Sequence, residues 1–330
     1  RGIIMIDIYG TLGPSCSDPD ILEKMFHAGM TGVRLNLSHV TIKEAAPQIE
    51  DLHEAARRCG IKAKLLVDMQ GPELRVGALK SAVRLENGAE AILGEGGIPV
   101  PEIALAYLDK GQEVLLDDGK LLLEVTGRHG RSVPARVVRG GELKSRKSIA
   151  LPGSSIYPPT MTEQDLGNIA LAAQYGVTGV MQPFVRDRHD LVTVRGALNA
   201  SGCGDIALFA KIENMDGVSH LDELIPECDV VVIARGDLGN AMPLWELPGV
   251  QKKIAAKCRK AGRPFLTVTQ MLASMEKNPV PTRAEVSDIY NAVLDGSSAV
   301  MVTGETAVGL YPVEVIKYLA NTAKEAQKAL

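Results

Sequence analysis

Eight short apolar runs recur along this chain of 330 residues, and each is followed by a helical pattern except where one insertion intervenes. Their length and β-branched residues are typical of strands buried in a parallel sheet. Eight strand–helix units are what a closed (β/α)8 TIM barrel requires, whereas a doubly wound sheet, the main alternative, would not normally need eight. We therefore predict an α/β fold of the TIM-barrel type. Its strands are expected at 3–8, 32–37, 63–67, 179–184, 206–210, 230–234, 264–269 and 299–303.

Between the third run and the fourth, the pattern changes to short alternating segments separated by glycines. This spacing is typical of antiparallel β structure, so we expect a small β-barrel lid domain at 76–150, inserted into a barrel formed by 1–75 and 151–330. The segment leaves through a basic stretch at 139–147, which is either a solvated turn or a lid that faces phosphate. The inserted strands are expected at 82–85, 90–93, 113–116, 121–125 and 132–138.

Helix signals follow most of the barrel strands. Ser17 and Pro19 are typical of a helix start, and Thr162 with Asp165 has the spacing of a capping box. The main helices are expected at 18–27, 41–58, 162–175, 188–200, 249–261, 283–294 and 312–328.

The composition narrows the class of protein. Hydrophobic residues make up 45% of the chain and charged residues 23%, which suffices for a full core and is not typical of disorder. The net charge is −4 and aromatics are only 4%, so no nucleic acid partner is expected. No apolar run approaches the roughly 18 residues of a membrane span, so no membrane partner is expected. The five cysteines lie apart, without zinc or redox spacing, which favours a cytoplasmic location.

Charged residues follow directly after two consecutive strands. Lys211 and Glu213 lie two apart after the run at 206–210, so an extended backbone points both to the same side. Asp237 follows the run at 230–234. The two carboxylates suit Mg²⁺, which binds one or two of them and leaves positions for substrate oxygens. A structural salt bridge at a strand end is the simpler alternative.

Glycines surround the second carboxylate. Gly236 and Gly239 flank Asp237, and a glycine-rich turn that opens a short helix leaves backbone amides exposed to an anion. Because the carboxyl ends of the strands form the catalytic face of a TIM barrel, we expect all these groups at one rim.

A third polar cluster ends the run at 32–37. Arg34, Asn36 and Ser38 lie on one side of an extended strand by the period of two. Three polar side chains on one strand face are not a core pattern, so they are candidate ligands. The alternative is a strand that simply emerges into solvent.

Together these stretches resemble the pyruvate kinase family over nearly the whole chain. Each motif alone is weak, but ten of them in the family's order are specific. The resemblance implies a TIM barrel with a β lid inserted after the third strand. It also implies a glycolytic reaction that moves a phosphoryl group from phosphoenolpyruvate to ADP, giving pyruvate and ATP. The similar stretches are Thr11-Leu-Gly-Pro-Ser15, Arg34-Leu-Asn-Leu-Ser-His39, Asp68 with Gly71-Pro-Glu-Leu-Arg75, Asp117-Asp-Gly119, Leu151-Pro-Gly153, Lys211-Ile-Glu-Asn214, Ala234-Arg-Gly-Asp-Leu-Gly239, Thr269-Gln-Met-Leu272, Pro281-Thr-Arg-Ala-Glu285 and Gly304-Glu-Thr-Ala307.

The resemblance implies roles at the strand ends. Glu213 and Asp237 would hold Mg²⁺ or Mn²⁺, and Lys211 would stabilise the charge that develops during transfer. Backbone amides at Gly236 and Asp237 would bind the substrate carboxylate, and Thr269 would protonate the enolate through water. Phosphoryl transfer needs such groups because it depends mainly on positioning and charge neutralisation.

The resemblance also implies a monovalent cation and a nucleotide site. Arg34 would grip the phosphoryl group, and Glu73 fits the potassium-dependent form of the family. K⁺ would be held by an all-oxygen set, namely Asn36, Ser38, Asp68 and the Met69 carbonyl. The residues implied to bind ADP or ATP are Arg34, Asn36, His39, Arg75 and Lys147.

Some positions depart from the family pattern. The family usually has a lysine at Gln70, a glycine at Val40, a serine at Thr303 and a lysine at Val308. The last change removes a cation from the nucleotide loop. Because the chain stops after the eighth helix, the C-terminal regulatory domain of longer relatives is expected to be absent, while a homodimer through the barrel stays open.

Three functions are compatible with these residues. The first is a pyruvate kinase-type phosphotransferase that depends on Mg²⁺ and K⁺. The second is a related enzyme for a different 2-oxo acid or enol phosphate, such as a metal-dependent aldol lyase or a specialised biosynthetic kinase, which the altered nucleotide loop favours. The third is a non-catalytic paralogue, against which the retained Lys211, Glu213, Asp237 and Thr269 argue.

Overall fold

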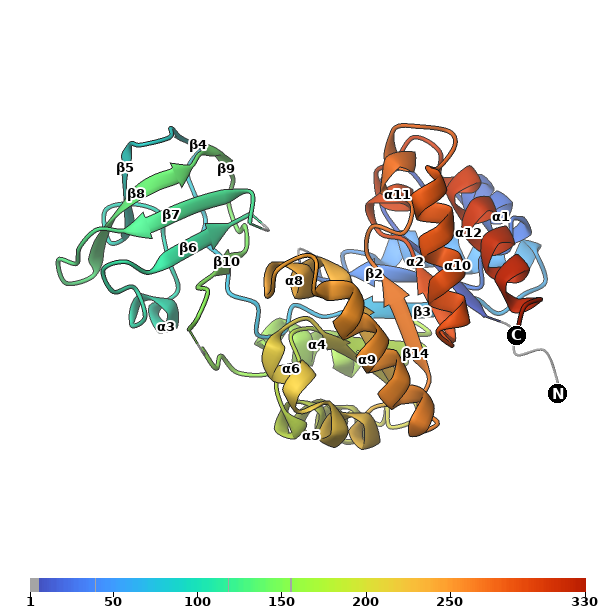
Figure 1. The fold of residues 1–330 in the computed structure, drawn as a ribbon. Coiled ribbons are helices and arrows are strands. Elements are labelled where there is room, and N and C mark those ends of the chain that lie inside the picture. Colours follow the sequence, from blue (N-terminus) through green and yellow to red (C-terminus); the bar gives the residue numbers. More distant parts are fainter. Residues whose placement is uncertain (1–5, 39, 118, 155) are drawn as a thin grey trace. The chain divides into compact units, whose positions relative to one another are not determined.

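The chain folds into two compact units, shown as a ribbon of the computed structural model in Figure 1. The structure describes residues 6–38, 40–117, 119–154 and 156–330. The barrel unit comprises Arg1–Gly71 and Thr160–Leu330, and the inserted unit comprises Pro72–Pro159. Each unit contains its own buried hydrophobic cluster.

Eight parallel strands close the barrel unit into a (β/α)8 TIM barrel, which confirms the predicted fold class. Around the circle the strands follow one another in chain order, and β15 pairs with β1 to complete the ring. The strands are β1 (Asp7–Thr11), β2 (Gly32–Asn36), β3 (Lys64–Asp68), β11 (Gly179–Gln182), β12 (Ala207–Ile212), β13 (Val230–Ala234), β14 (Phe265–Val268) and β15 (Ala299–Met301).

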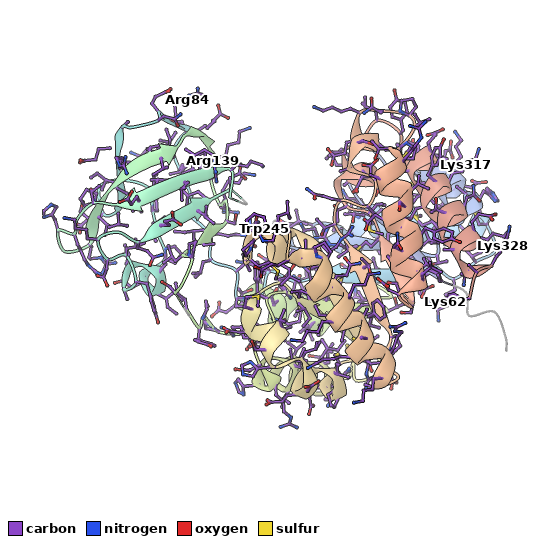
Figure 2. All side chains as sticks on the ribbon, viewed as in Figure 1. Lys62, Arg84, Arg139, Trp245, Lys317 and Lys328 are labelled. Carbon is purple, nitrogen blue, oxygen red and sulfur yellow. The ribbon has the colours of Figure 1, made fainter. Side chains whose placement is uncertain are left out.

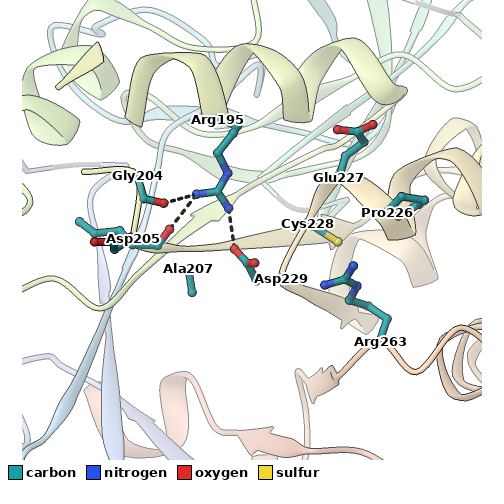
Figure 3. Close-up of a pocket in the computed structure, with 10 residues that line it drawn as sticks. Arg195, Gly204, Asp205, Ala207, Pro226, Glu227, Cys228, Asp229 and Arg263 are labelled. Atoms are coloured by element: carbon teal, nitrogen blue, oxygen red, sulfur yellow. Dashed lines mark hydrogen bonds and ion pairs between the residues drawn. The ribbon is translucent and has the colours of Figure 1, made fainter. Parts of the chain in front are cut away.

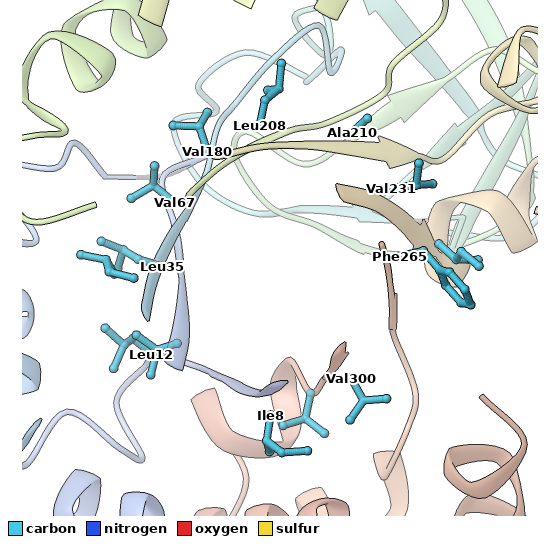
Figure 4. Close-up of a cluster of buried hydrophobic side chains, with 14 of the residues drawn as sticks. Ile8, Leu12, Leu35, Val67, Val180, Leu208, Ala210, Val231, Phe265 and Val300 are labelled. Carbon is cyan, nitrogen blue, oxygen red and sulfur yellow. The ribbon is translucent and has the colours of Figure 1, made fainter. Parts of the chain in front are cut away.

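Side chains along each barrel strand alternate between two cores. One set, which includes Val67 and Leu208, packs with the surrounding helices (Figure 4). The other set, which includes Leu66 and Phe209, forms a separate cluster inside the barrel. Because side chains repeat with a period of two, Lys211 shares the inward face of Phe209 and lies one layer nearer the carboxyl end of β12.

Helices follow the strands and bury their apolar faces on the outer core. Among the described residues, no helix combines the length and the apolar character needed to cross a bilayer. The helical elements of the barrel unit are α1 (Pro19–His27), α2 (Ala46–Arg58), α4 (Glu163–Leu171), α5 (Arg188–Ala200), α6 (Met215–Ser219), α7 (Leu221–Leu224), η1 (Ile225–Glu227), α8 (Arg235–Asn240), α9 (Leu247–Lys260), η2 (Ala273–Glu276), α10 (Arg283–Leu294), α11 (Gly304–Ala307) and α12 (Pro312–Gln327).

Two of the predicted helix starts are wrong. α1 is capped by Asp18, whose Oδ1 accepts a hydrogen bond from the Asp20 amide at 2.7 Å, and not by Ser17. α2 begins later than residue 41, because the Glu44 carboxylate binds the Thr41 amide at 2.7 Å in a separate turn. Both differences are local competitions between side-chain and backbone partners.

The first strand lies at Asp7–Thr11 rather than at 3–8, so Thr11 belongs to the strand and not to the turn that follows. Thr306 holds it there. The Thr306 hydroxyl accepts from the Thr11 amide at 2.8 Å and donates to the Thr11 carbonyl at 3.0 Å. This contact joins the two ends of the barrel sequence, which a local pattern cannot show. Residues 3–5 of the predicted strand lie outside the described residues.

The inserted unit consists of antiparallel strands with a short helix. Five strands pair in the order β10, β6, β7, β8, β5, and β4 pairs with β9. The basic exit at 139–147 is more than a turn, since part of it forms β9. The elements are β4 (Val83–Leu85), β5 (Glu90–Gly94), α3 (Glu102–Leu105), β6 (Glu113–Leu116), β7 (Leu121–Val125), β8 (Ser132–Arg139), β9 (Gly141–Leu143) and β10 (Ile149–Ala150).

Candidate active site

Lys211 lies in a buried cluster of charges at the carboxyl end of β12. Its side chain is only 13% exposed. Its ammonium lies 3.2 and 3.1 Å from the two Asp68 oxygens and 3.1 Å from Glu213 Oε1. An unpaired buried charge would be very costly, so these two carboxylates keep Lys211 charged inside the barrel.

Asp68 links two cations that come from different strands. Arg34 on β2 places Nε and Nη2 at 2.8 and 2.7 Å from Asp68 Oδ2. Lys211 on β12 approaches the same carboxylate, which is almost fully buried. The barrel thus assembles a cation, an anion and a second cation from β2, β3 and β12, where the sequence predicted only that they share a rim.

The charges in this cluster hold one another ionised. Burial alone would raise the pKa of Asp68, but Lys211 and Arg34 outweigh it and lower that pKa below its usual value. Burial alone would lower the pKa of Lys211, but Asp68 and Glu213 raise it above the usual lysine value, with a smaller contribution from Asp237. These partners favour the charged form of Lys211, which suits it to stabilise negative charge and not to act as a general base.

Glu213 is oriented by a strained backbone as well as by Lys211. Phe184 follows β11 with φ of 50°, a left-handed conformation that is uncommon outside glycine. Its amide donates to Glu213 Oε2 at 2.8 Å, while Lys211 takes the other oxygen. Sequence reasoning missed Phe184, because a backbone conformation of this kind leaves no signal in the residue type.

Asp237 and Gly236 lie in α8, which begins directly after β13. Asp237 is near enough to Lys211 to raise the pKa of that lysine. A Cβ added to Gly236 would lie 3.0 Å from Thr269 Cγ2, so the absence of a side chain lets Thr269 approach. The structure therefore brings four of the predicted residues to the same rim of the barrel, namely Lys211, Gly236, Asp237 and Thr269.

Arg235 holds the turn that carries Thr269. Thr269 and Gln270 both have positive φ, 81° and 53°, directly after β14. Arg235 Nη2 donates to the Thr269 carbonyl at 2.7 Å, and Nη1 donates to Asp288 Oδ1 at 2.8 Å. Arg235 belongs to the same motif as Asp237, so a signal existed in the sequence, but its role needs the contact with α10.

The cluster has an excess of negative charge that a divalent cation would balance. Lys211 and Arg34 face the carboxylates of Asp68, Glu213 and, at longer range, Asp237. In the part of the chain that the structure describes, no three His, Cys, Asp or Glu side chains form a metal cluster. A pair of carboxylates suits Mg²⁺, which fills its other positions with water and substrate oxygens. Glu213 contacts the Lys211 ammonium and Asp237 lies near enough to raise its pKa, so both acids of the predicted pair lie beside this ammonium.

The residues predicted to bind K⁺ surround the ends of β2 and β3. Asn36 is in register with Asp68, and its Oδ1 accepts from the Ser38 amide at 3.0 Å. Because Arg34 and Lys211 already contact Asp68, a cation there would share this carboxylate with them. Asn36 and Arg34 are also predicted nucleotide residues. The third such residue, His39, lies outside the described residues.

Asp165 fixes the backbone that follows Met69. Its oxygens accept from the Gln70 amide at 2.8 Å and from the Gly71 amide at 3.0 Å. The predicted capping box with Thr162 at the start of α4 is confirmed. Sequence reasoning assigned Asp165 only this cap, because its second role depends on α4 packing beside the end of β3.

The inserted unit contains the other two predicted nucleotide residues. Arg75 and Lys147 are brought together by the antiparallel bridge between Arg75 and Ser148. Arg75 pairs with Glu73, and Lys147 Nζ lies 2.8 Å from Asp117 Oδ1. Both cations are thus paired with carboxylates of their own unit.

The loop after β15 carries Val308, the position at which the sequence departs from the lysine of the family pattern. Glu305 is buried, and its Oε2 accepts from the Thr303 amide at 2.7 Å, so it has a structural role. Val308 is 61% exposed. A Cβ on Gly304 would lie 2.2 Å from Glu276 Oε1, which places that carboxylate beside the loop. The loop therefore exposes an apolar side chain at the position where the family pattern has a lysine, and Glu276 of η2 lies beside the loop.

The closed barrel and the paired charges at its carboxyl rim define a TIM-barrel protein with the site geometry of an enzyme. Residues 4–316 match the family model described as "Pyruvate kinase, barrel domain". The chain belongs to the pyruvate kinase family.

Several named relatives support this assignment. A pyruvate kinase from Bacillus licheniformis is 38% identical over 97% of this chain and 57% of the relative. One from Methylorubrum extorquens is 39% identical over 97% of this chain and 68% of the relative, and one from Chlamydia trachomatis is 36% identical over 96% and 67%. The chain spans little more than half the length of the first of these relatives.

Proposed function

We propose that the chain catalyses phosphoryl transfer from phosphoenolpyruvate to ADP, giving pyruvate and ATP. The observation that carries this proposal is the Lys211 ammonium, buried between Asp68 and Glu213 at the rim of the barrel. Such a cation suits a reaction in which negative charge moves between phosphoryl and enolate oxygens. The relatives' names agree with this chemistry.

The chain's own residues would position the substrate before transfer. Arg34 would bind the phosphoryl group, and the amides at Gly236 and Asp237 would bind the carboxylate. Lys211 would stabilise the charge on the transferring group. As the phosphorus–oxygen bond to the enol breaks, a new bond forms to the terminal phosphate oxygen of ADP. Thr269 would then deliver a proton, through water, to the methylene carbon of the enolate, which becomes pyruvate.

Two cations complete the proposed site. Mg²⁺ or Mn²⁺, held by Glu213 and Asp237, would neutralise the phosphoryl and enolate oxygens when bound. K⁺ would be held by Asn36, Ser38, Asp68 and the Met69 carbonyl.

The proposed nucleotide residues are those that the family pattern implies. Arg34, Asn36 and His39 would contribute from the barrel sequence. Arg75 and Lys147 would exchange their present carboxylate partners for phosphate oxygens, so the inserted unit would act as a lid domain.

The proposal includes a cytoplasmic location, a role in glycolysis and no nucleic acid or membrane partner. All five cysteines are free, which suits a reducing compartment.

We also propose a homodimer through the barrel, because Leu244 and Trp245 are adjacent and 69% and 83% exposed. Figure 2 labels Trp245. Light scattering of the purified chain measures this association directly.

A coupled assay, in which lactate dehydrogenase reduces the pyruvate formed, tests the proposed reaction. We expect pyruvate to form from phosphoenolpyruvate only with ADP and Mg²⁺, and faster with K⁺ than with Na⁺. A folded protein that forms no pyruvate with any nucleotide or cation would contradict the proposal.

A second candidate rests on one residue. Val308 stands where the family pattern has a lysine, which motivates a related enzyme that uses a 2-oxo acid without a nucleotide, but the relatives' names do not favour it. Calorimetry separates the two candidates, because this second enzyme would bind pyruvate with Mg²⁺ but would not bind ADP.

A further inference from the structure

The loop after β2 is held by a side chain from a distant helix of the barrel unit. Gln164 lies in the first turn of α4 and is half-buried. Its Nε2 donates to the Leu37 carbonyl at 2.9 Å and to the Val40 carbonyl at 3.3 Å. One amide group thus binds the backbone on both sides of Ser38, which is a proposed ligand of K⁺.

The next residue of α4 holds the loop after β3 in the same way. Asp165 is fully buried, and its oxygens accept from the Gln70 and Gly71 amides. These amides follow directly after Met69, whose carbonyl is another proposed K⁺ ligand. Because Gln164 and Asp165 are consecutive, a single dipeptide fixes both loops that carry the proposed ligands.

The Met69 carbonyl is a buried polar group that lacks a donor. Met69 is only 1% exposed, and its amide donates to the Met181 carbonyl at 3.1 Å. Within the described ranges of the chain, no hydrogen bond reaches its own carbonyl oxygen. Most buried carbonyls have a partner, so this oxygen is available to a ligand. Asn36 and Asp68, which are in register beside it, supply further oxygens, and such a set fits a cation.

A helix side chain that holds backbone carbonyls is not by itself a sign of function. At the amino ends of the barrel strands, Arg195 of α5 donates to the carbonyls of Gly204 and Ile206, each at 3.0 Å (Figure 3). Arg195 also pairs with Asp229, so the protein itself satisfies this guanidinium. The contact made by α4 differs, because it fixes the backbone next to an oxygen that has no partner.

We propose that Gln164 is a positioning residue that sets the preference of the proposed monovalent-cation site for K⁺ over Na⁺. This inference rests on the K⁺ site of the proposed function. In ion sites built from protein oxygens, these oxygens replace the hydration shell of the ion. Na⁺ is smaller than K⁺, so a loop that could move would close around Na⁺. By holding the backbone around Ser38, Gln164 keeps the spacing for the larger ion without touching it.

The melting temperature of the full chain measures this preference without any substrate. The chain is titrated with KCl or NaCl at constant ionic strength, which is maintained with tetramethylammonium chloride. An ion that binds only the folded state raises the melting temperature, and the concentration dependence of the rise gives its dissociation constant. The K⁺ preference is the dissociation constant of Na⁺ divided by that of K⁺.

We expect the wild type to prefer K⁺ and Gln164→Met to lower this preference about tenfold, as is typical when a residue that orients a metal ligand is lost. Methionine keeps the length of the side chain but cannot donate a hydrogen bond. An equal preference in Gln164→Met and wild type would refute the role of Gln164. A wild type that does not prefer K⁺ would overturn the proposal.

Two control variants separate positioning from stability. Arg195→Met removes the comparable contacts at the amino ends of the strands, so it should melt at a lower temperature and keep the K⁺ preference. Gln174→Met makes the same chemical change at an exposed position after α4 and should alter neither quantity. A preference lowered equally in Arg195→Met and Gln164→Met would indicate a general effect of destabilisation and would refute the proposal.

Gln164→Lys tests whether the donated hydrogen bonds are responsible. Lysine keeps an N–H donor, and its charge repels K⁺ and Na⁺ alike, so the preference should be higher than in Gln164→Met. A preference as low as in Gln164→Met would contradict the role of these bonds. The measurements need no nucleotide or phosphoenolpyruvate. A chain that shows the expected preferences but forms no pyruvate would therefore support the positioning role and refute only the proposed reaction.

Discussion

Lys211 in the barrel unit and Lys147 in the inserted unit are both assigned to phosphate chemistry, but their surroundings differ. The Lys211 side chain is 13% exposed and contacts Asp68 and Glu213. The Lys147 side chain is 35% exposed and contacts Asp117. A buried charge depends on its partners for folding as well as for function, whereas a partly exposed one is screened by water and can change partners. The barrel therefore holds preorganised charge, and the insertion holds adjustable charge.

The largest effect is expected from Lys211→Met. An unchanged free energy of unfolding in this variant would contradict the contrast between the buried and the partly exposed lysine. Asp68 and Glu213 would lose the cation between them, so we expect a loss of about 3–5 kcal/mol in the free energy of unfolding. Pyruvate formation should fall by a factor of at least about 10²–10³. Urea unfolding and the coupled assay measure the two effects. Lys257→Met, which removes an ion pair with the 75% exposed Asp222, serves as the control and should change neither strongly.

Acid unfolding compares Lys211 and Lys147 through the carboxylates that contact them. The pKa of Asp68 is lower in the folded protein than in the unfolded chain, so its contribution is present above about pH 4 and is lost as the pH falls through the folded pKa. We expect Asp68→Asn to be less stable at pH 7 and to lose less stability between pH 7 and pH 3 than the wild type.

The pKa of Asp117 is also lowered. Burial alone would raise it, but Lys147 and Lys120 outweigh this effect. Because these lysines are more exposed than Lys211, Asp117→Asn should show the same change with a smaller amplitude. Urea unfolding at a series of pH values gives both curves. Parallel curves for Asp68→Asn and wild type would argue against the coupling of Asp68 to its cations.

A smaller and more selective effect is expected from Lys147→Gln. If this lysine binds nucleotide phosphate, its loss should raise the KM for ADP by about tenfold and leave the KM for phosphoenolpyruvate unchanged. Stability should change by less than about 1 kcal/mol. The control is Lys144→Gln, since Lys144 is 66% exposed and pairs with the exposed Glu142. Equal KM values for Lys147→Gln and this control would remove Lys147 from the nucleotide site.

The smallest effect is expected from Val308→Lys. A lysine at this exposed position would add an attractive but screened charge, so we expect the KM for ADP to fall by a few fold. Leu310→Lys, at a 69% exposed position of the same loop, controls for net charge. An equal fall in both variants would indicate a general electrostatic effect and not a specific phosphate contact.

Local patterns in the sequence determined much of this protein. The eight apolar runs predicted the barrel, and the spacing of Thr162 and Asp165 predicted a cap that is present. The period of two placed Lys211 and Glu213 on one side, and both indeed meet at the rim. These features depend on backbone repeats within a few residues, which the order of residue types specifies directly.

Tertiary structure alone decided which groups pair. Asp68 lies between Arg34 and Lys211 because β2, β3 and β12 converge at one end of the closed barrel. The positive φ of Phe184 and the contact between Thr11 and Thr306 likewise exist only once distant segments pack together. The physical reason is that a side chain's partner is set by the closure of strands far apart in the chain, and its burial then sets how strongly that partner acts.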